Sequence, residues 1–487
     1  MPLEVLLSEL AEAVGGKVIG SDRTPVTDVT HDSRQAGPGT LFVAVRGFTT
    51  NGHDYLPQAV ANGAVAVCVE ERQDIGVPQL VVADGRAALP TLAATVHRHP
   101  SRRLRVVGVT GTNGKTTVAY LLESIATAAG LRSAVVGTIG AHIGGRPIPL
   151  GRTTPEASDL QRLLAQMVDR EVDVAAIEVS SHALALHRVD EVLFTVAAFT
   201  NLTQDHLDFH VDMDDYYTAK ASLFKSGRTD RAVIWVDDPY GSRLASESTI
   251  PVTRVGLGVD ADVRAVSIEV TPTGSRFELI DRGDARLVEL PLGGAFNIEN
   301  ALVAAACARE LGITLDAVDR GLGSVPQIPG RFEKIDAGQG FAVIVDYAHT
   351  PEGIAAVISA ARRVSRGAIV VVVGAGGDRD RLKRPLMGEA AAQADVAIIT
   401  SDNPRSEDPL AIIDEVVAGM GKGTVMRQVV QDRRTAIRTA LRTAAAGDVV
   451  LILGKGHEQG QELSGRIEPF DDRVVAGEEL AKLEAAS

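Results

Sequence analysis

The stretch "VGVTGTNGKTTVAY" (107–120) decides the fold of this chain, because it joins an apolar run, a glycine-containing loop and the start of a helix. Apolar residues recur after the loop at helical spacing, namely Val118, Leu121, Leu122 and Ile125. A strand, a loop and a helix in this order form a phosphate-binding loop, in which backbone N–H groups and the helix N-terminus surround an anion. The stretch therefore predicts an α/β domain with a nucleotide site.

This loop departs from the general pattern G-x-x-x-x-G-K-[ST]. The glycine of that pattern stands six residues before the lysine, but the residue six before Lys115 is Val109, and glycines occur instead at Gly108 and Gly111. Lys115 still supplies a full positive charge, and Thr116 is placed to offer its hydroxyl to Mg²⁺. The departure indicates a specialised form of the loop.

Length and composition favour a large α/β enzyme. A chain of 487 residues exceeds the usual size of one hydrophobic core, and we expect three domains. It contains 45% hydrophobic, 23% charged and 4% aromatic residues with 48 glycines, which excludes a fibrous or disordered chain. The two cysteines, Cys68 and Cys307, lack metal-ligand spacing, so we expect buried thiols and neither a disulfide framework nor a zinc site.

The charge balance limits the partners. Forty-nine basic and 63 acidic residues give a net charge of −14, which argues against nucleic-acid and membrane-surface binding. The start of the chain has no basic region typical of a signal peptide, and no apolar run reaches the roughly 20 residues that span a bilayer. We expect a cytoplasmic protein without membrane insertion, with small-molecule substrates and no obligate protein partner.

The pattern along the chain predicts three domains, at 1–100, 101–328 and 329–487, with the polar stretch "HRHPSRRLR" (97–105) as a linker. Strand-like apolar runs occur at 40–45, 64–69, 106–109, 174–179, 195–200, 231–236, 341–346, 368–374, 395–400 and 448–453. Helical segments separate most of them, which indicates parallel sheets.

A polar motif follows directly after seven of these apolar runs. The motifs are "TGTNGKTT", "SSH", "NLTQDH", "YAHTP", "AGGDRD", "SDNPR" and "GKGHE". Open parallel sheets bind ligands beyond the carboxyl ends of their strands, so we expect these motifs to face one another across a cleft. The alternative is that each is an ordinary strand-to-helix turn, for which Gly, Asp, Asn and Ser are common residues.

The form "GTNGKTT" resembles the phosphate loop of the Mur ligase family of ATP-dependent amide-bond enzymes. The resemblance extends along nearly the whole chain, through "HDSRQAGPGTLFVAVRG" (31–47), "GRTTP" (151–155), "EVSSHALALHRV" (178–189), "TNLTQDHLDFH" (200–210), "YYTAKASLF" (216–224), "GAFNIENALVAAA" (294–306), "PGRFE" (329–333), "VDYAHTPEG" (345–353), "GAGGDRDRLKRPLMG" (374–388), "DNPRSEDP" (402–409) and "GKGHE" (454–458). It implies a small N-terminal α/β domain that binds a UDP-substrate, a central P-loop parallel-sheet ATPase domain and a C-terminal Rossmann-like domain that binds an amino acid.

The resemblance implies a set of ATP-binding residues, which are Gly111, Thr112, Asn113, Gly114, Lys115, Thr116, Thr117, Asn300, Arg331 and Asp346. In the family pattern, Asn300 contacts adenine, Asp346 contacts ribose and Arg331 reaches the terminal phosphate. Because Arg331 and Asp346 lie in the third domain, closure of that domain would complete the site and exclude water.

Two Mg²⁺ ions and a modified lysine are also implied. Thr116 and Glu178 resemble ligands of one ion, and His206 resembles a ligand of a second. Lys220 matches the family lysine that CO2 converts into a carbamate, an anion able to bridge magnesium, although by itself it resembles a solvated helix residue. The residues expected to be catalytic are Lys115, Lys220, His206 and Arg331.

Substrate residues follow from the same resemblance. For the UDP-N-acetylmuramoyl-dipeptide they are Ser33, Phe48, Thr49, Thr50, Thr153, Thr154, Ser180 and Arg188. Two positions depart from some relatives, since Leu186 stands in place of a glutamine and Arg152 in place of an asparagine. For meso-diaminopimelate they are Arg384, Asp402, Asn403, Pro404, Arg405, Gly454 and Glu458.

The motif "DNPR" (402–405) carries the predicted specificity. Diaminopimelate has a distal carboxylate that lysine lacks, and Arg405 can hold it through paired charge-assisted hydrogen bonds. The resemblance implies a peptidoglycan-precursor ligase that adds meso-diaminopimelate to the γ-carboxylate of UDP-N-acetylmuramoyl-L-alanyl-D-glutamate through an acyl phosphate. The alternatives are a lysine-adding ligase of this type, a folylpolyglutamate synthetase-like ligase, and a P-loop ATPase switch without ligase activity.

Overall fold

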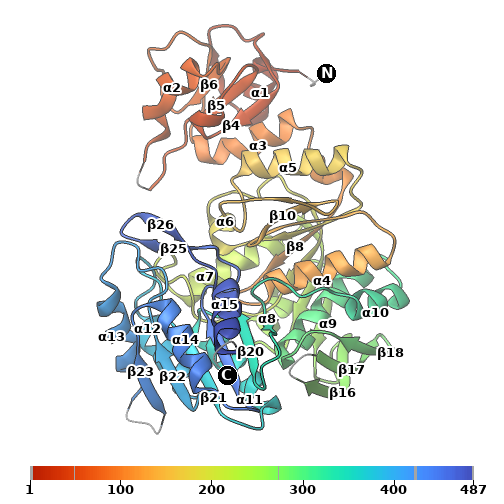
Figure 1. The fold of residues 1–487 in the computed structure, drawn as a ribbon. Coiled ribbons are helices and arrows are strands. Elements are labelled where there is room, and N and C mark those ends of the chain that lie inside the picture. The colour runs from red at the N-terminus through yellow and green to blue at the C-terminus, as the bar shows by residue number, and fades with distance from the viewer. Residues whose placement is uncertain (1–3, 49, 272–273, 422–424, 485–487) are drawn as a thin grey trace.

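The computed structural model describes residues 4–48, 50–271, 274–421 and 425–484. These residues form three α/β domains, and the central domain contacts both of the others (Figure 1). The N-terminal domain contacts one end of the central domain, and the C-terminal domain lies against its side. Each domain has its own sheet and its own buried apolar clusters. The expected α/β class and three-domain architecture are confirmed.

The N-terminal domain contains a five-stranded sheet in the order β2-β7-β6-β5-β4. Its elements are β1 (Val5–Leu6), α1 (Leu7–Val14), β2 (Lys17–Ile19), β3 (Pro25–Val26), β4 (Asp28–Thr30), β5 (Thr40–Val43), α2 (Leu56–Ala61), β6 (Ala66–Val69), β7 (Gln79–Val81) and α3 (Gly85–Val96). The predicted linker after it is not a free segment, because Pro100–Arg103 form a short 3-10 helix and Ser101 Oγ accepts a hydrogen bond from the Leu193 N–H at 3.1 Å.

The central domain is built on an eleven-stranded sheet in the order β11-β10-β9-β12-β8-β13-β14-β15-β16-β17-β18. Its strands are β8 (Arg105–Thr110), β9 (Ser133–Gly137), β10 (Gly140–Ile143), β11 (Arg146–Ile148), β12 (Val174–Glu178), β13 (Phe194–Phe199), β14 (Thr229–Trp235), β15 (Val252–Gly256), β16 (Val263–Thr271), β17 (Gly274–Asp281) and β18 (Asp284–Leu290). Its helices are α4 (Lys115–Ala128), α5 (Ala157–Asp169), α6 (Ser181–Ala185), α7 (Met213–Ala221), α8 (Pro239–Glu247), α9 (Ala295–Glu310) and α10 (Leu315–Gly323).

The predicted parallel sheet is confirmed for the middle of this domain, where β9, β12, β8, β13, β14, β15 and β16 run parallel. Both edges are antiparallel hairpins that the sequence analysis did not predict. Gly144 and Gly145, both with positive φ, form the turn between β10 and β11, and Gly283 with φ +101° forms the turn between β17 and β18.

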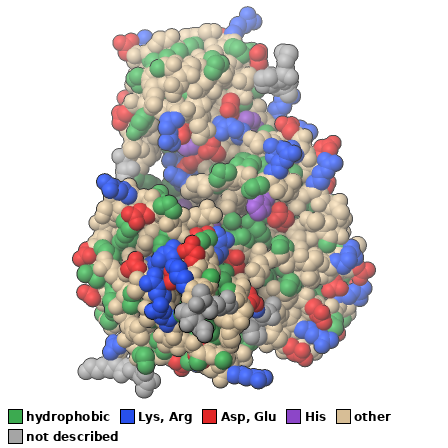
Figure 2. Space-filling view, in the orientation of Figure 1, with side chains coloured by type: hydrophobic (Ala, Val, Ile, Leu, Met, Phe, Trp, Pro, Cys, Tyr) green, Lys and Arg blue, Asp and Glu red, His purple; other side chains and the backbone are tan. Residues whose placement is uncertain are grey.

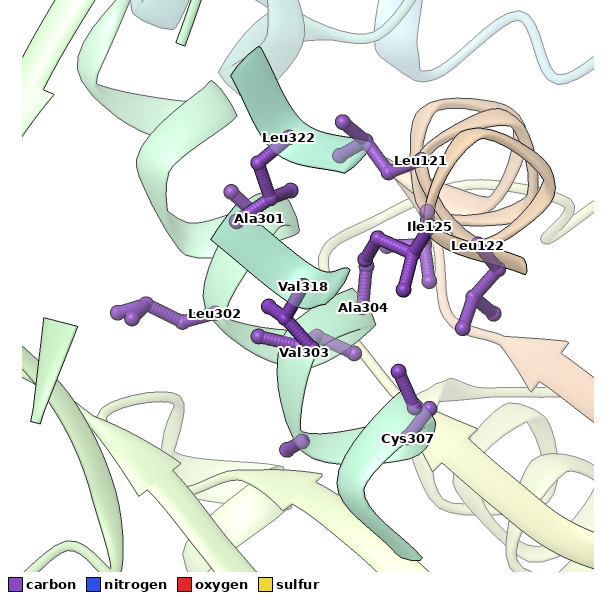
Figure 3. Close-up of a cluster of buried hydrophobic side chains, with 14 of the residues drawn as sticks. Leu121, Leu122, Ile125, Ala301, Leu302, Val303, Ala304, Cys307, Val318 and Leu322 are labelled. Carbon is purple, nitrogen blue, oxygen red and sulfur yellow. The ribbon is translucent and has the colours of Figure 1, made fainter. Parts of the chain in front are cut away.

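Helix α4, which begins at Lys115, packs its predicted apolar face against α9 and α10 (Figure 3). Leu121, Leu122 and Ile125 are at most 1% exposed. The close approach needs a glycine, since a Cβ on Gly321 would lie 2.4 Å from the Ile125 Cα. Burial of each such side chain contributes about 1.5–3 kcal/mol to the free energy of unfolding. This packing therefore fixes the orientation of α4 and of its N-terminus, where the phosphate loop ends.

The C-terminal domain has a six-stranded sheet in the order β19-β20-β24-β21-β22-β23, in which only β19 is antiparallel to its neighbour. Its elements are β19 (Glu333–Ile335), β20 (Ala342–Asp346), α11 (Pro351–Val364), β21 (Ile369–Val373), α12 (Lys383–Ala391), β22 (Val396–Ile399), α13 (Pro409–Gly419), β23 (Met426–Val429), α14 (Arg433–Thr443), β24 (Val449–Leu453), β25 (Gly460–Leu463), β26 (Arg466–Pro469) and α15 (Asp472–Glu484).

Three further observations concern the whole chain. Cys68 and Cys307 are both free and buried, as expected. Among the described residues, no helix combines the length and the apolar character that crossing a bilayer requires. Acidic and basic side chains both occur on the face drawn in Figure 2.

Candidate active site

Two cavities of about 430 Å³ each adjoin at the junction of the central and C-terminal domains. All seven motifs predicted to face a cleft contribute lining residues to one or both of them. The walls that the two cavities share are formed by Thr138, Thr153, Asp205, His206, Tyr347 and His349. The expectation of a common cleft is therefore confirmed, and two ligands bound in these cavities would meet at the shared wall.

The phosphate loop lines the first cavity, which we call the nucleotide cavity. The departure from the general pattern has a structural reason, because Val109 lies inside β8, is fully buried and pairs with Ala198 of β13. A glycine there would remove core packing. The loop instead bends at Gly111 (φ +146°) and Gly114 (φ +88°), where added Cβ atoms would lie 1.9 Å from Thr200 Oγ1 and 2.2 Å from Asn300 Oδ1.

Two buried lysines converge on one carbonyl of this loop. Lys115 Nζ donates to the carbonyl oxygens of Gly111 and Thr112, both at 2.9 Å, and Lys220 Nζ donates to the same Gly111 oxygen at 2.8 Å. Burial lowers the pKa of Lys115. Burial and the neighbouring charge of Lys115 lower the pKa of Lys220 well below its ordinary value. Taken by itself, Lys220 resembles a solvated helix residue, but α7 places this side chain at 1% exposure.

The C-terminal domain completes the nucleotide cavity. Arg331 donates from Nη2 to Thr116 Oγ1 at 2.9 Å, and its guanidinium lies 4.5 Å from the centre of the Tyr347 ring. Asp346 at the end of β20 accepts from the N–H groups of Phe332 (2.6 Å) and Ala348 (2.7 Å). Burial raises the pKa of Asp346, although these contacts oppose the shift.

Most of the predicted ATP-binding residues line this cavity. They are Thr112, Asn113, Gly114, Lys115, Thr116, Thr117, Asn300, Arg331 and Asp346. Gly111 and Lys220 do not line this cavity. They are joined by the hydrogen bond from Lys220 Nζ to the Gly111 carbonyl, which holds the start of the phosphate loop.

The predicted metal donors Thr116, Glu178 and His206 all line the same cavity. Thr138 donates to Glu178 from its N–H and its hydroxyl, both at 2.9 Å. Burial lowers the pKa of His206 to about 3, so its imidazole is neutral and can act as a ligand.

This donor set fits a magnesium ion only in part. In the described part of the chain, no group of three or more His, Cys, Asp or Glu side chains is close enough together to hold a metal by itself. Mg²⁺ commonly takes one or two carboxylates, waters and substrate phosphates, so the oxygens of Thr116 and Glu178 beside a phosphate loop suit it.

The second cavity, which we call the amino-acid cavity, combines acidic and basic groups. Glu458 Oε2 accepts from Asn403 Nδ2 at 2.8 Å and from the buried Lys455 Nζ at 2.9 Å. Arg405, held at φ +53°, donates to the Gly377 carbonyl at 2.6 Å and lies 3.2 Å from Glu462. The cavity thus offers cationic and anionic partners to a zwitterionic ligand.

The predicted diaminopimelate residues divide into two groups. Asp402, Asn403, Arg405, Gly454 and Glu458 line the amino-acid cavity. Pro404 and Arg384 do not. Arg384 is 1% exposed and pairs with Glu407 at 2.7 Å and Glu415 at 2.8 Å, which holds its guanidinium away from the wall.

Arg379 lines this cavity and was missed by the sequence reasoning. It stands five residues before Arg384 in the motif "GGDRDRLKR". The signal was its place in the segment between β21 and α12, at the carboxyl end of a parallel strand, whereas Arg384 already belongs to α12. Lys455, which pairs with Glu458 three residues later in the motif "GKGHE", was also missed.

The predicted UDP-substrate residues are spread over two regions. Thr153 lies in the shared wall, Ser180 lines the nucleotide cavity, and Thr154 Oγ1 donates to the Glu178 carbonyl at 2.8 Å. Arg188 is buried and pairs with Glu156 at 2.9 Å. Arg152, which stands where some relatives have an asparagine, also pairs with Glu156, at 2.8 Å.

The remaining predicted residues belong to the N-terminal domain. Ser33 donates to Gln58 Oε1 at 2.8 Å, Phe48 is 82% exposed and Thr50 is exposed, while Thr49 lies outside the described residues. The structure does not bring Ser33, Phe48 or Thr50 to the wall of either cavity. The Phe48 ring nevertheless reaches the central domain, 6.1 Å from the Phe209 ring.

Comparison with known proteins places all three domains in one family. The models described as "Mur ligase family, catalytic domain", "Mur ligase middle domain" and "Mur ligase, glutamate ligase domain" match residues 25–107, 109–308 and 330–456. Curated relatives named UDP-N-acetylmuramoyl-L-alanyl-D-glutamate–2,6-diaminopimelate ligase include those of Streptomyces avermitilis (44% identical, 98% of this chain and 97% of the relative) and Geobacillus thermodenitrificans (44% identical, 98% of both chains).

Solved structures give the same picture. A structure of a protein with that name is 31% identical, with a TM-score of 0.69 over 99% of this chain and 100% of the other. MurF from Acinetobacter baumannii, at 22% identity, shares the fold with a TM-score of 0.70 over 100% of both chains. The matched models and the full-length relatives establish the family: the chain belongs to the Mur ligases, which are ATP-dependent ligases.

Proposed function

We propose that this protein joins meso-diaminopimelate to the D-glutamyl γ-carboxylate of UDP-N-acetylmuramoyl-L-alanyl-D-glutamate, with ATP converted to ADP and phosphate. The observation that carries the proposal is the shared wall between a phosphate-loop cavity and an acid–base amino-acid cavity. An acyl phosphate formed in the first cavity would lie beside an amine held in the second. The relatives that bear this name match almost the whole chain, which supports the assignment.

Phosphoryl transfer would rely on positive charge around the loop. Lys115 Nζ lies within the phosphate loop, against the Gly111 and Thr112 carbonyls, and Arg331 contacts Thr116 from the other domain. Both groups can stabilise the charge that develops on the transferred phosphoryl group without a covalent step. Because Arg331 belongs to the C-terminal domain, ATP would meet its full set of partners only when the domains close, which excludes water from the acyl phosphate.

Magnesium would be held by the oxygens of Thr116 and Glu178 on one side and by the neutral imidazole of His206 on the other. When bound, such ions would neutralise phosphate charge and polarise the phosphoryl oxygens. The chain's own residues orient these donors, since Thr138 fixes both carboxylate oxygens of Glu178.

Lys220 is proposed to carry a carbamate. The reaction needs the neutral amine, which attacks CO2 to form a C–N bond and releases one proton, leaving an N-carboxylate. Complete burial and the adjacent charge of Lys115 both favour the neutral amine, as its lowered pKa indicates. The resulting anion beside Lys115 would replace a like-charge contact with an opposite-charge one.

The amino-acid cavity would recognise both ends of diaminopimelate. Arg405, with Arg379 on the same wall, would hold the distal carboxylate, which lysine lacks. Glu458 would accept from the distal ammonium, because two donors, Asn403 and Lys455, fix its Oε2 and leave Oε1 for the ligand. Asp402 and Gly454 complete this wall.

The UDP-substrate would span the N-terminal and central domains. Ser33, Phe48 and Thr50 are proposed contacts on the uridine side, and Thr153, Thr154, Ser180 and Arg188 on the side of the sugar and peptide. This reaction would place the protein in the cytoplasm, at a step of peptidoglycan precursor synthesis.

A direct assay tests the function. The protein is incubated with ATP, Mg²⁺, the UDP-dipeptide and one amino acid from a panel of meso-diaminopimelate, L-lysine and L-glutamate, and phosphate and UDP-tripeptide are measured. We expect product only with diaminopimelate. Product with lysine instead would identify the lysine-adding type, and steady phosphate release without either substrate would reject a ligase.

A further inference from the structure

The amine that attacks an acyl phosphate must first lose a proton, because an ammonium group has no lone pair. If the proposed function holds, this proton leaves where the two cavities meet. Of the side chains in the shared wall, only Asp205, His206 and His349 belong to the residue types that act as general bases, since threonine and tyrosine hydroxyls stay protonated at neutral pH.

Asp205 and His206 are poorly suited to this step. The Asp205 carboxylate is buried and lies beside three other side chains, Lys383, His206 and His349. Its Oδ1 is already bound by Lys383 Nζ at 2.9 Å and by the His206 N–H at 2.9 Å. His206 is a proposed metal ligand, and a lone pair bound to a metal cannot take a proton.

His349 has the required arrangement. Its Nδ1 lies 2.8 Å from the carbonyl oxygen of Tyr347, and a carbonyl can only accept, so Nδ1 carries the ring proton. The neutral ring therefore has its lone pair on Nε2. That atom lies 3.7 Å from Asp205 Oδ2, too far for a hydrogen bond yet close enough for the carboxylate to stabilise an imidazolium. The Tyr347 ring, 4.7 Å away, packs edge-on against it.

We infer that His349 is the general base for the incoming amine, with the Tyr347 carbonyl fixing its tautomer and Asp205 stabilising its charged form. The ammonium group of the bound amino acid transfers one proton to His349 Nε2. The amine lone pair then forms the C–N bond at the acyl carbon, the C–O bond to phosphate breaks, and phosphate leaves with the bonding electrons. The second amine proton goes to the departing phosphate or to solvent. The side chain is 36% exposed, so the imidazolium can return its proton to water.

The test separates formation of the acyl phosphate from its aminolysis. Hydroxylamine replaces the amino acid in one arm, because it is largely unprotonated at neutral pH and traps the acyl phosphate as a hydroxamate without a base. The other arm contains meso-diaminopimelate, and both contain ATP, Mg²⁺ and the UDP-dipeptide. The variants are His349→Ala and His349→Asn, the second of which keeps a donor near the Tyr347 carbonyl but has no acceptor at the Nε2 position. His187→Ala, at a half-exposed histidine paired with Asp190, is the matched control.

We expect both His349 variants to form hydroxamate within about threefold of the wild-type rate and to lose diaminopimelate product by about 100-fold or more, the range typical of a missing general base. The KM for diaminopimelate should stay within about threefold. A parallel loss in both arms would overturn the inference, since it would assign His349 to nucleotide binding or domain closure, and so would an unchanged rate with diaminopimelate. Wild-type protein that forms neither product would reject the proposed function and this inference with it.

Discussion

Arg331 of the C-terminal domain donates a 2.9 Å hydrogen bond to Thr116 Oγ1 of the phosphate loop, although 215 positions separate the two residues in the sequence. The contact places a cation from one domain on the hydroxyl that would help to hold Mg²⁺ in another. Two further contacts cross the same boundary. Lys383 Nζ lies 2.9 Å from Asp205 Oδ1, and His457 Nε2 donates to the Thr138 carbonyl at 3.2 Å. These contacts join the two domains across the cleft.

Removal of Arg331 should impair phosphoryl transfer more than nucleotide binding. Arg331→Ala is expected to lower kcat by about 100- to 1,000-fold, because one charged donor on the developing phosphate charge contributes about 3–4 kcal/mol. Phosphate release and the Kd for ATP are measured together. A fall in ATP affinity that accounts for the whole loss would contradict the proposed role.

Lys220 is expected to act as a carbamate and not as a cation. Lys220→Ala should be inactive and should regain part of its activity with a short carboxylic acid, which supplies the missing anion to the site. Lys220→Arg is the matched variant, since it keeps the positive charge that reaches the Gly111 carbonyl but cannot add CO2. Wild-type activity in the arginine variant would rule the carbamate out, and mass spectrometry at high bicarbonate would detect the adduct directly.

Arg405 should select for the distal carboxylate of diaminopimelate. Arg405→Ala is expected to reduce kcat/KM for diaminopimelate by about 2–5 kcal/mol in free-energy terms, because the ligand carboxylate would lose its charged partner. The kcat for hydroxylamine should not change, since that nucleophile has no carboxylate. Arg442→Ala, an exposed position on α14, serves as the control for general effects of losing an arginine. Equal kcat/KM values for the Arg405 variant and the wild type would reject the assignment.

Arg384 should stabilise the domain instead of binding the ligand. Arg384→Ala would leave Glu407 and Glu415 without their shared partner, and we expect a loss of about 1–3 kcal/mol in the free energy of unfolding. Arg379→Ala, which changes a residue of the cavity wall, should instead raise the KM for diaminopimelate with little change in stability. Urea unfolding and steady-state kinetics on both variants distinguish the two roles. A raised KM in Arg384→Ala together with a loss of stability in Arg379→Ala would contradict both assignments.

Restoring the glycine of the general phosphate-loop pattern should harm the protein. Val109→Gly removes a fully buried side chain from β8 and adds backbone freedom, so we expect a loss of about 2–4 kcal/mol in the free energy of unfolding. Nucleotide affinity should not improve, because the loop begins only after Thr110, where β8 ends. A variant that is as stable as the wild type and binds ATP more tightly would contradict this explanation of the departure.

Local patterns predicted much of the architecture. Apolar runs of four to seven residues predicted ten strands to within about two residues, because buried strands between helices leave a strong and local signal. Other parallel strands, such as β9, β15 and β23, were not predicted. The antiparallel edges of the central sheet were missed, since β10 and β11 have only four and three residues, and β17 and β18 are half-exposed and contain no continuous apolar run. The turn glycines Gly144, Gly145 and Gly283 were visible but do not by themselves indicate pairing.

For the site, the sequence by itself determined the phosphate loop, the order of the seven motifs and the resemblance to the Mur ligases, which implies the ligands that these motifs bind. It could do so because each motif is contiguous and follows its own strand. Only the tertiary structure decided which side chains face the cavities: it buried Lys220 against Gly111, turned Arg384 into the domain interior, placed Arg379 on the wall and brought His349 opposite Asp205. The orientation and the protonation of these side chains depend on domain packing and on burial. Both are set by residues that are distant in the sequence, so the local order of residues does not predict them.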